Sequence, residues 1–184
     1  MILVYERHDG PDTAAQLDAF LSTYEEVYAE PPYNEGPSDI RHFIEGYHVQ
    51  AQRPGMRLIL AREGAEVIAF TYGFLLTAET RWWSTVRPLP PADFTLEDGD
   101  RTFAVLELAV RKPWRRRGVA AALHTALLEG LRVDRVTLSV RPEPEAAPAQ
   151  SAYASWGYRG VGRSQPWQDA PIYEVMVLDL IERG

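Results

Sequence analysis

A short basic stretch ahead of an expected helix is the part of the chain whose residues point most directly to chemistry. Five cationic side chains stand within residues 111–117, and Gly118 and a run of small residues follow at once. The apolar segment 102–110 is typical of a buried strand, and residues 117–130 are typical of a helix. A helix N-terminus after a glycine-containing turn attracts anions, because its first N–H groups lack intrahelical partners. We therefore expect a phosphate or pyrophosphate ligand here.

The pattern of this stretch narrows the ligand further. The phosphate-binding patterns GxxxxGK[ST] and GxGxxG are both absent. The chain instead reads Arg115-x-x-Gly118-x-Ala120, which resembles the acetyl-CoA motif Arg/Gln-x-x-Gly-x-Gly/Ala of the GNAT superfamily of N-acetyltransferases. The block from about 102 to 160 resembles the family in its flanking elements, down to Tyr153-x-x-x-Gly157-Tyr158, whereas the N-terminal half resembles it only in element order. Taken alone, the basic run would also fit a solvated helix start.

The resemblance implies that acetyl-CoA is the co-substrate. Backbone N–H groups of the motif loop would bind its pyrophosphate, and the edge of the preceding strand would pair with its pantetheine arm. The implied cofactor-binding residues are Leu108, Ala109, Val110, Arg115, Arg116, Arg117, Gly118, Val119 and Ala120. The side chains of Arg111, Lys112, Arg116 and Arg117 would reach the 3′-phosphate or simply face water.

Two residues are candidates for proton transfer. Glu107 interrupts an otherwise apolar strand, where a carboxylate is costly unless it faces a polar cleft. Burial would raise its pKa toward the range useful for a general base, although a structural carboxylate fits the same position. Tyr153 stands where the family usually has its general acid, and a core aromatic residue is the alternative.

Aromatic residues gather in the segments that, by the resemblance, surround the acceptor. The proposed substrate-binding residues are Tyr28, Tyr33, Tyr72 and Trp82. Such rings can enclose an apolar or cationic amine, and Glu30, Glu35 and Asp39 would add negative potential. Core packing remains the alternative for any single ring. A small-molecule amine and a protein amine both stay open as the acceptor.

The elements that must position these residues follow from the hydrophobic periodicity. We expect strands near 2–6, 57–62, 67–76, 102–110, 135–140, 158–162 and 171–180, and helices near 13–29, 38–51, 117–130 and 149–156. Asp12 or Thr13 would cap the first helix and Ser38 the second. Residues 77–101 read as a long irregular connection. The expected fold is α/β (α+β), a single domain over 1–184 with a mixed, splayed central sheet of about seven strands and about four helices.

Composition excludes several classes of function. The chain has 184 residues and no cysteine, which rules out disulfides, thiolate metal sites and a cysteine nucleophile. A net charge of -7 argues against nucleic-acid binding. No apolar run is long enough to span a membrane, no signal peptide is evident, and the histidines lack metal-ligand spacing. We expect a cytoplasmic protein without a metal, and a homodimer paired through its last strand is possible.

The leading interpretation is an acetyl-CoA-dependent N-acetyltransferase that moves an acetyl group to a primary amine. Transfer would occur by direct attack in a ternary complex, since no cysteine exists to carry the acyl group. A non-catalytic GNAT-fold module that senses acyl-CoA or binds a partner is the alternative.

Overall fold

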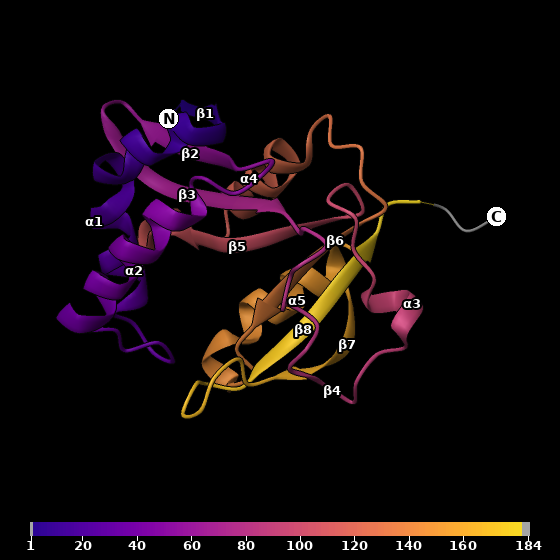
Figure 1. Ribbon diagram of the computed structural model, residues 1–184. Coiled ribbons are helices and arrows are strands. Elements are labelled where there is room, and N and C mark those ends of the chain that lie inside the picture. Colours follow the sequence, from indigo (N-terminus) through magenta and orange to yellow (C-terminus); the bar gives the residue numbers. More distant parts are fainter. Residues whose placement is uncertain (1, 182–184) are drawn as a thin grey trace. The chain divides into compact units, whose positions relative to one another are not determined.

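The computed structural model describes residues 2–181, which form two compact units (Figure 1). The first unit takes in the chain up to Phe74 together with Leu106–Leu131, and the second takes in Leu75–Val105 and the chain from Arg132 onward. The boundary falls inside β5 (Thr102–Val110). The expectation of a single domain over 1–184 stays a prediction.

The first unit is built on antiparallel strands. β1 (Leu3–Asp9) pairs with β2 (Arg57–Glu63), and β2 pairs with β3 (Glu66–Leu75) through the expected tight turn. Its helices are α1 (Leu17–Tyr28), α2 (Pro37–Gln50) and α4 (Val119–Leu128), with short 3-10 turns at Gly10–Gln16 and Lys112–Trp114. The strand at 2–6 and the hairpin at 57–76 are therefore confirmed.

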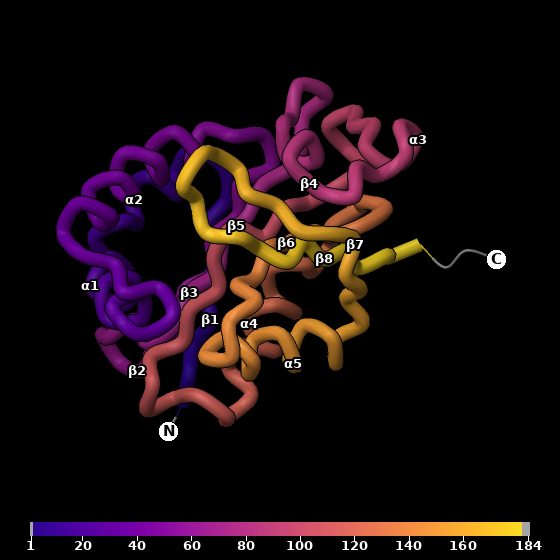
Figure 2. Tube along the Cα trace, turned by 90° about the horizontal axis from the view of Figure 1, so that it is seen from below, coloured from indigo at the N-terminus to yellow at the C-terminus, as the bar shows by residue number. Residues whose placement is uncertain are grey.

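Aromatic side chains fill the core of this unit. α1 and α2 lie side by side (Figures 1 and 2), and the ring of Phe20 meets those of Phe43 and Tyr47 edge-on. Phe20 also packs 4.5 Å from Phe70 of β3, measured between ring centroids. The helical spacing of these residues places them on one face of each helix, so their burial holds both helices on the strands.

The two expected helix caps are wrong. The first α-helix begins only at Leu17, because residues 10–16 form a 3-10 turn in which the Thr13 hydroxyl donates to the Gly10 carbonyl. The second begins at Pro37, one residue before Ser38, since proline is favoured at the first helical position. The Asp39 carboxylate accepts a hydrogen bond from the N–H of Gly36, at 2.8 Å, and so supports this helix start.

The second unit contains the remaining strands. β6 (Arg135–Val140) pairs in parallel with β5 over Thr102–Val105 and antiparallel with β8 (Tyr173–Asp179), which in turn pairs with β7 (Arg159–Ser164). A 3-10 turn at Pro144–Ala146 leads into α5 (Ala147–Ser155). β8 is hydrogen-bonded on both sides over most of its length, so the expected pairing of this strand across subunits is wrong. A homodimer formed in another way stays a prediction.

The mixed α/β fold is confirmed, with slightly different counts. The strand order is β1-β2-β3-β5-β6-β8-β7-β4, and residues 2–181 hold eight strands and five α-helices. The additions are β4 (Val86–Arg87), paired with β7, and α3 (Ala92–Thr95). Both lie in the connection 77–101 that we expected to be irregular. Two strand residues and one helical turn are too short for periodicity to reveal.

Polar interactions inside the second unit anchor this connection. The Glu97 carboxylate accepts hydrogen bonds from the Trp83 indole at 2.9 Å and from the Arg135 guanidinium at 2.8 Å. The Arg135 guanidinium also lies over the rings of Trp83 and Phe94, 4.8 and 4.3 Å from their centroids. A buried ion pair with cation–π contacts to two neighbouring rings therefore holds this connection to β6. Among the described residues, no helix combines the length and the apolar character needed to cross a membrane.

Candidate functional site

The basic stretch forms the expected strand–turn–helix arrangement within the first unit. β5 ends at Val110, and α4 begins at Val119. The backbone of Gly118 has φ +78, a left-handed conformation that favours glycine, and a Cβ built there would meet no atom within 4 Å. The first intrahelical hydrogen bond runs from Ala122 N to Gly118 O at 3.0 Å. The N–H groups of residues 119–121 therefore have no acceptor one turn earlier in the helix, and they suit an anion.

Two arginines of the stretch are engaged in ion pairs of the first unit. Arg111 lies 3.0 Å from a Glu26 oxygen and 2.9 Å from a Glu66 oxygen, and only 14% of its side chain is exposed. Arg111 therefore does not face open water, and its expected contact with the 3′-phosphate stays a prediction. Arg115 binds the Glu30 carboxylate with two nitrogens, at 2.8 and 3.1 Å.

The remaining cations of the stretch face outward, and the helix behind them is firmly held. Lys112, Arg116 and Arg117 are exposed. At the far end of α4, Arg57 donates hydrogen bonds to the carbonyls of Leu127 and Glu129, at 3.0 and 2.7 Å. A cation at a helix C-terminus is favourable because it meets the negative end of the helix dipole. These bonds fix the orientation of α4, and with it the direction of its N-terminal N–H groups.

Glu107 lies partly buried in β5 and has a perturbed pKa. The Tyr28 hydroxyl donates a short hydrogen bond to Glu107 Oε2, and the Thr71 hydroxyl donates to the Glu107 carbonyl at 2.7 Å. Burial raises the pKa of the Glu107 carboxyl to about 8; the Tyr28 hydrogen bond opposes this shift and the nearby Glu35 carboxylate adds to it. A carboxyl group that titrates near pH 8 can accept a proton from a substrate at neutral to alkaline pH.

Tyrosines of α1 and its following turn pack around Tyr28, the residue that contacts Glu107. The rings of Tyr24 and Tyr28, one helical turn apart, lie 4.4 Å from each other, and the Tyr33 ring lies 4.8 Å from that of Tyr28. Burial, and then the charge of Glu107, raise the pKa values of Tyr24 and Tyr28, so both phenols are neutral donors at physiological pH. The charge of Glu35 also raises the pKa of Tyr24.

The structure brings some of the proposed site residues together and places others in the second unit. Tyr28, Tyr33 and Tyr72 lie in the first unit with Glu107. Tyr72 is almost fully buried, with 1% exposure, and its hydroxyl donates to Gln50 at 2.8 Å. Tyr72 therefore fits core packing, which is the alternative that we left open for any single ring.

Trp82 and Tyr153 belong to the second unit. The Trp82 indole donates to the Thr137 hydroxyl at 3.2 Å. The Tyr153 ring, on α5, contacts those of Trp156 and Tyr158, with centroids 5.5 and 5.8 Å apart. Their roles in binding and catalysis stay predictions.

One neighbour of the site was missed from the sequence. Tyr24 packs on Tyr28, and the charge of Glu107 raises its pKa, but its position on the apolar face of a helix suggested only core packing. The signal that could have revealed it is the four-residue spacing of Tyr24 and Tyr28, which places both phenols on the same helix face.

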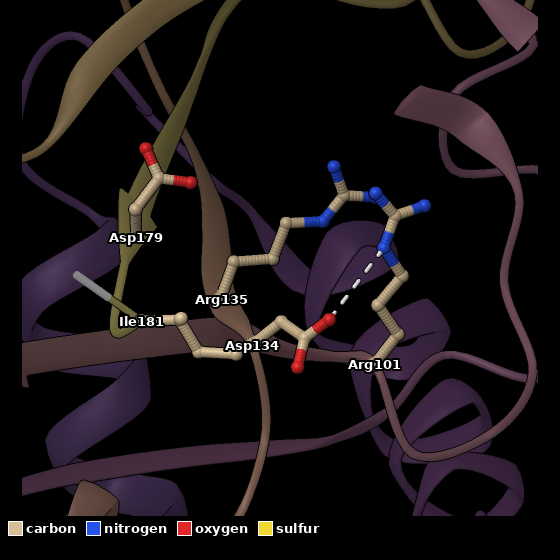
Figure 3. Close-up of a pocket in the computed structure, with 5 residues that line it drawn as sticks. All are labelled: Arg101, Asp134, Arg135, Asp179 and Ile181. Carbon is tan, nitrogen blue, oxygen red and sulfur yellow. Dashed lines mark ion pairs between the residues drawn. The ribbon is translucent and has the colours of Figure 1, made fainter. Parts of the chain in front are cut away.

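A cavity in the second unit does not contain the proposed residues. Arg101, Asp134, Arg135, Asp179 and Ile181 line it (Figure 3). Its volume of about 170 Å³ is well below the roughly 300–1,000 Å³ typical of ligand pockets. Arg101 and Arg135 both donate to carbonyls of the 93–96 segment, so we attribute this cavity to the anchoring of that segment. Within residues 2–181, no group of three or more His, Asp or Glu side chains is placed to hold a metal ion.

Comparison with known proteins identifies relatives of this fold. The model of the acetyltransferase (GNAT) family matches residues 17–158. No curated protein matches the chain. Among solved structures, a GNAT-family acetyltransferase from Staphylococcus aureus is similar, with a TM-score of 0.63 at 14% identity over 98% of this chain and 100% of that one.

Two further similar structures contain a cofactor. One is yncA of Salmonella typhimurium with acetyl-CoA, with a TM-score of 0.61 at 13% identity over 100% of this chain and 97% of that one. The other is the PaiA N-acetyltransferase of Thermoplasma acidophilum with coenzyme A, with a TM-score of 0.60 at 10% identity over 97% of this chain and 99% of that one. At such low sequence identity, these similarities show that the fold is shared and nothing about the acceptor.

Proposed function

Because the chain belongs to the acetyltransferase (GNAT) family, we propose that it transfers an acetyl group from acetyl-CoA to a primary amine by direct attack in a ternary complex. The observation that carries this proposal is Glu107, a partly buried carboxyl group with a pKa of about 8 on the strand that leads into the motif. A base of that pKa is matched to an ammonium substrate at neutral to alkaline pH.

Acetyl-CoA would bind at the turn between β5 and α4. The N–H groups from Arg115 to Ala120 would hold the pyrophosphate, and the left-handed Gly118 would leave room for it. Residues 108–110 would pair with the pantetheine arm, and a backbone N–H there would stabilise the negative charge that develops on the acetyl oxygen. When bound, acetyl-CoA supplies the activated acetyl thioester.

Glu107 would act on the acceptor. Its carboxylate takes one proton from the acceptor ammonium, and Tyr28 holds the carboxylate in place through its hydroxyl. The freed amine nitrogen then bonds to the acetyl carbonyl carbon and releases its second proton to solvent, the carbon–sulfur bond breaks, and the sulfur leaves as a thiolate. In the prediction drawn from the family resemblance, Tyr153 gives that thiolate a proton.

The acceptor site would use the aromatic surroundings of Glu107. Tyr28 and Tyr33 lie in ring contact in the first unit, and such rings can enclose a cationic amine. Small-molecule amines and protein amines both fit this description. The acceptor must therefore be found by screening.

The test is release of CoA from acetyl-CoA in the presence of a panel of amines, followed with a thiol-reactive chromogen. Because the chain has no cysteine, the chromogen reports only the CoA thiol. We expect wild type to release CoA in an amine-dependent way, and Glu107→Gln to lower kcat by about 10²–10⁴-fold with acetyl-CoA affinity retained. Tyr153→Phe tests the predicted acid in the same assay.

The outcomes separate the two functions considered. Acetyl-CoA binding without transfer to any amine would favour the non-catalytic sensor. Transfer that is unchanged in Glu107→Gln would keep the enzyme but reject Glu107 as its base.

A further inference from the structure

One ion pair of the first unit joins the turn after α1 to the turn that precedes α4. The Glu30 carboxylate accepts hydrogen bonds from two nitrogens of Arg115, at 2.8 and 3.1 Å, and Arg115 Nε donates to the Val110 carbonyl at 2.8 Å. A two-nitrogen contact of this kind fixes the orientation of the two groups as well as their distance. The pair therefore holds the two turns in one arrangement.

Glu30 also builds the turn to which it belongs. Its carbonyl accepts hydrogen bonds from the N–H groups of Tyr33 and Asn34, at 3.0 and 3.1 Å. The Tyr33 ring packs 4.8 Å from that of Tyr28, measured between centroids, and both rings are proposed to enclose the acceptor. We name residues 30–34 the acceptor-side turn. A displacement of Glu30 would displace this turn and its tyrosine.

The same arginine stands at the start of the proposed pyrophosphate site. Arg115 opens the motif that ends at Ala120, and its bonds to Val110 and Glu30 engage Nε, Nη1 and Nη2 once each. Each terminal nitrogen of a guanidinium carries a second N–H, and such donors suit a phosphate oxygen. Arg115 can therefore meet a phosphate without releasing Glu30. An anion bound at this turn would restrict the motion of Arg115, and with it that of Glu30.

We propose that Glu30 is a positioning residue through which cofactor binding orders the acceptor-side turn. This inference rests on the proposed function, because it takes acetyl-CoA to bind between β5 and α4. The bound anion fixes Arg115, Arg115 holds the Glu30 carboxylate, and the Glu30 carbonyl holds Tyr33. Acetyl-CoA thereby stabilises the wall that is proposed to enclose the acceptor. Glu30 acts through its partners and takes no part in the chemistry.

Amide hydrogen exchange, followed by NMR, tests this coupling without an acceptor. The probe is CoA, and the reporters are the Tyr33 and Asn34 amides, which donate to Glu30. In wild type, we expect saturating CoA to slow the exchange of both amides by about two- to fivefold, the range that corresponds to a partly exposed ion pair. The affinity for CoA is measured on the same preparations by calorimetry.

Glu30→Ala tests the residue itself. The variant keeps the backbone carbonyl that forms the turn and loses the carboxylate that binds Arg115. We expect its affinity for CoA to stay within about threefold of wild type, while the two amides no longer slow when CoA binds. Glu6→Ala is the matched control, since Glu6 pairs with Arg62 at 2.9 Å elsewhere in the first unit and should leave the slowing intact.

Each variant is compared with itself, with and without CoA. A general loss of stability speeds exchange in both states, so it does not imitate the expected result. Wild-type amides that do not slow with CoA bound, or an unchanged slowing in Glu30→Ala, overturn the proposal and leave the proposed function standing. Loss of the slowing in Glu6→Ala, or loss of CoA binding in Glu30→Ala alone, overturns it too. Failure of wild type to bind CoA overturns the proposed function itself.

Discussion

Replacing Tyr28 with phenylalanine would remove the hydroxyl that donates to the Glu107 carboxylate. The ring would remain and keep its contacts with Tyr24 and Tyr33. A hydrogen bond donated to a carboxylate stabilises its charged form, so its loss raises the pKa of Glu107 above about 8. We therefore expect Tyr28→Phe to need a higher pH for activity.

The size of this shift follows from the strength of such a bond. A hydrogen bond to a charged group contributes about 1.5–3 kcal/mol, which corresponds to about one to two pH units. At pH 7.5 the ionised fraction of Glu107 is about a quarter in wild type and about 3% or less in the variant. The variant's kcat/KM should therefore fall about tenfold or more at pH 7.5, yet come within about twofold of wild type near pH 10.

The assay is kcat/KM from pH 6 to 10.5 with one acceptor, read from the released CoA thiol. Because the acceptor is the same for each enzyme, its own ionisation affects all profiles equally. Glu107→Gln should lack the rise near pH 8. Tyr5→Phe is the matched control, since Tyr5 lies on β1 and is not among the groups that shift the pKa of Glu107.

A loss of activity that is equal at every pH would refute the reasoning, because it would mean that the hydroxyl acts by packing or folding alone. A rise that moves to lower pH would contradict the sign of the hydrogen bond.

Three further predictions concern stability. Folding raises the pKa of Glu107 from 4.5 to about 8, so the free energy of unfolding of wild type should fall by up to about 5 kcal/mol between pH 4.5 and 8. Urea unfolding of Glu107→Gln should lack this fall. Burial lowers the pKa of His124 to about 4, so the free energy of unfolding should instead fall as the pH drops from 6.5 toward 4. His124→Leu should remove that decline, and an unchanged decline in the variant would contradict this assignment. Gly118→Ala should lower Tm by about 2–4 °C through its positive φ, and a calorimetric scan with no change would show that the turn relaxes.

The periodic elements could be predicted from the sequence because they bury long apolar faces. The apolar segments 57–62 and 67–76 around a tight turn placed the β2–β3 hairpin correctly, and the apolar run 102–110 matches β5. Helix starts were harder to predict, since Thr13 and Ser38 each had a local alternative. The Thr13 hydroxyl donates a hydrogen bond to the Gly10 carbonyl within a 3-10 turn, and Pro37 takes the first helical position ahead of Ser38.

The site was predictable only where a single residue broke a pattern. Glu107 stands out because it is the one charge in an apolar strand, and its raised pKa follows from that burial. The partners of the basic residues were not predictable. Arg111 and Arg115 bind carboxylates that lie 45 to 85 positions away in the chain, so only the fold shows that these charges are already paired.

The most direct test of the account is calorimetric titration of acetyl-CoA into wild type, Gly118→Ala and Gly118→Glu. The two variants share the same backbone strain, and only glutamate adds bulk and negative charge at the proposed pyrophosphate site. The account predicts binding to wild type and Gly118→Ala, and none to Gly118→Glu. Absence of binding to wild type, or equal binding by both variants, would contradict it.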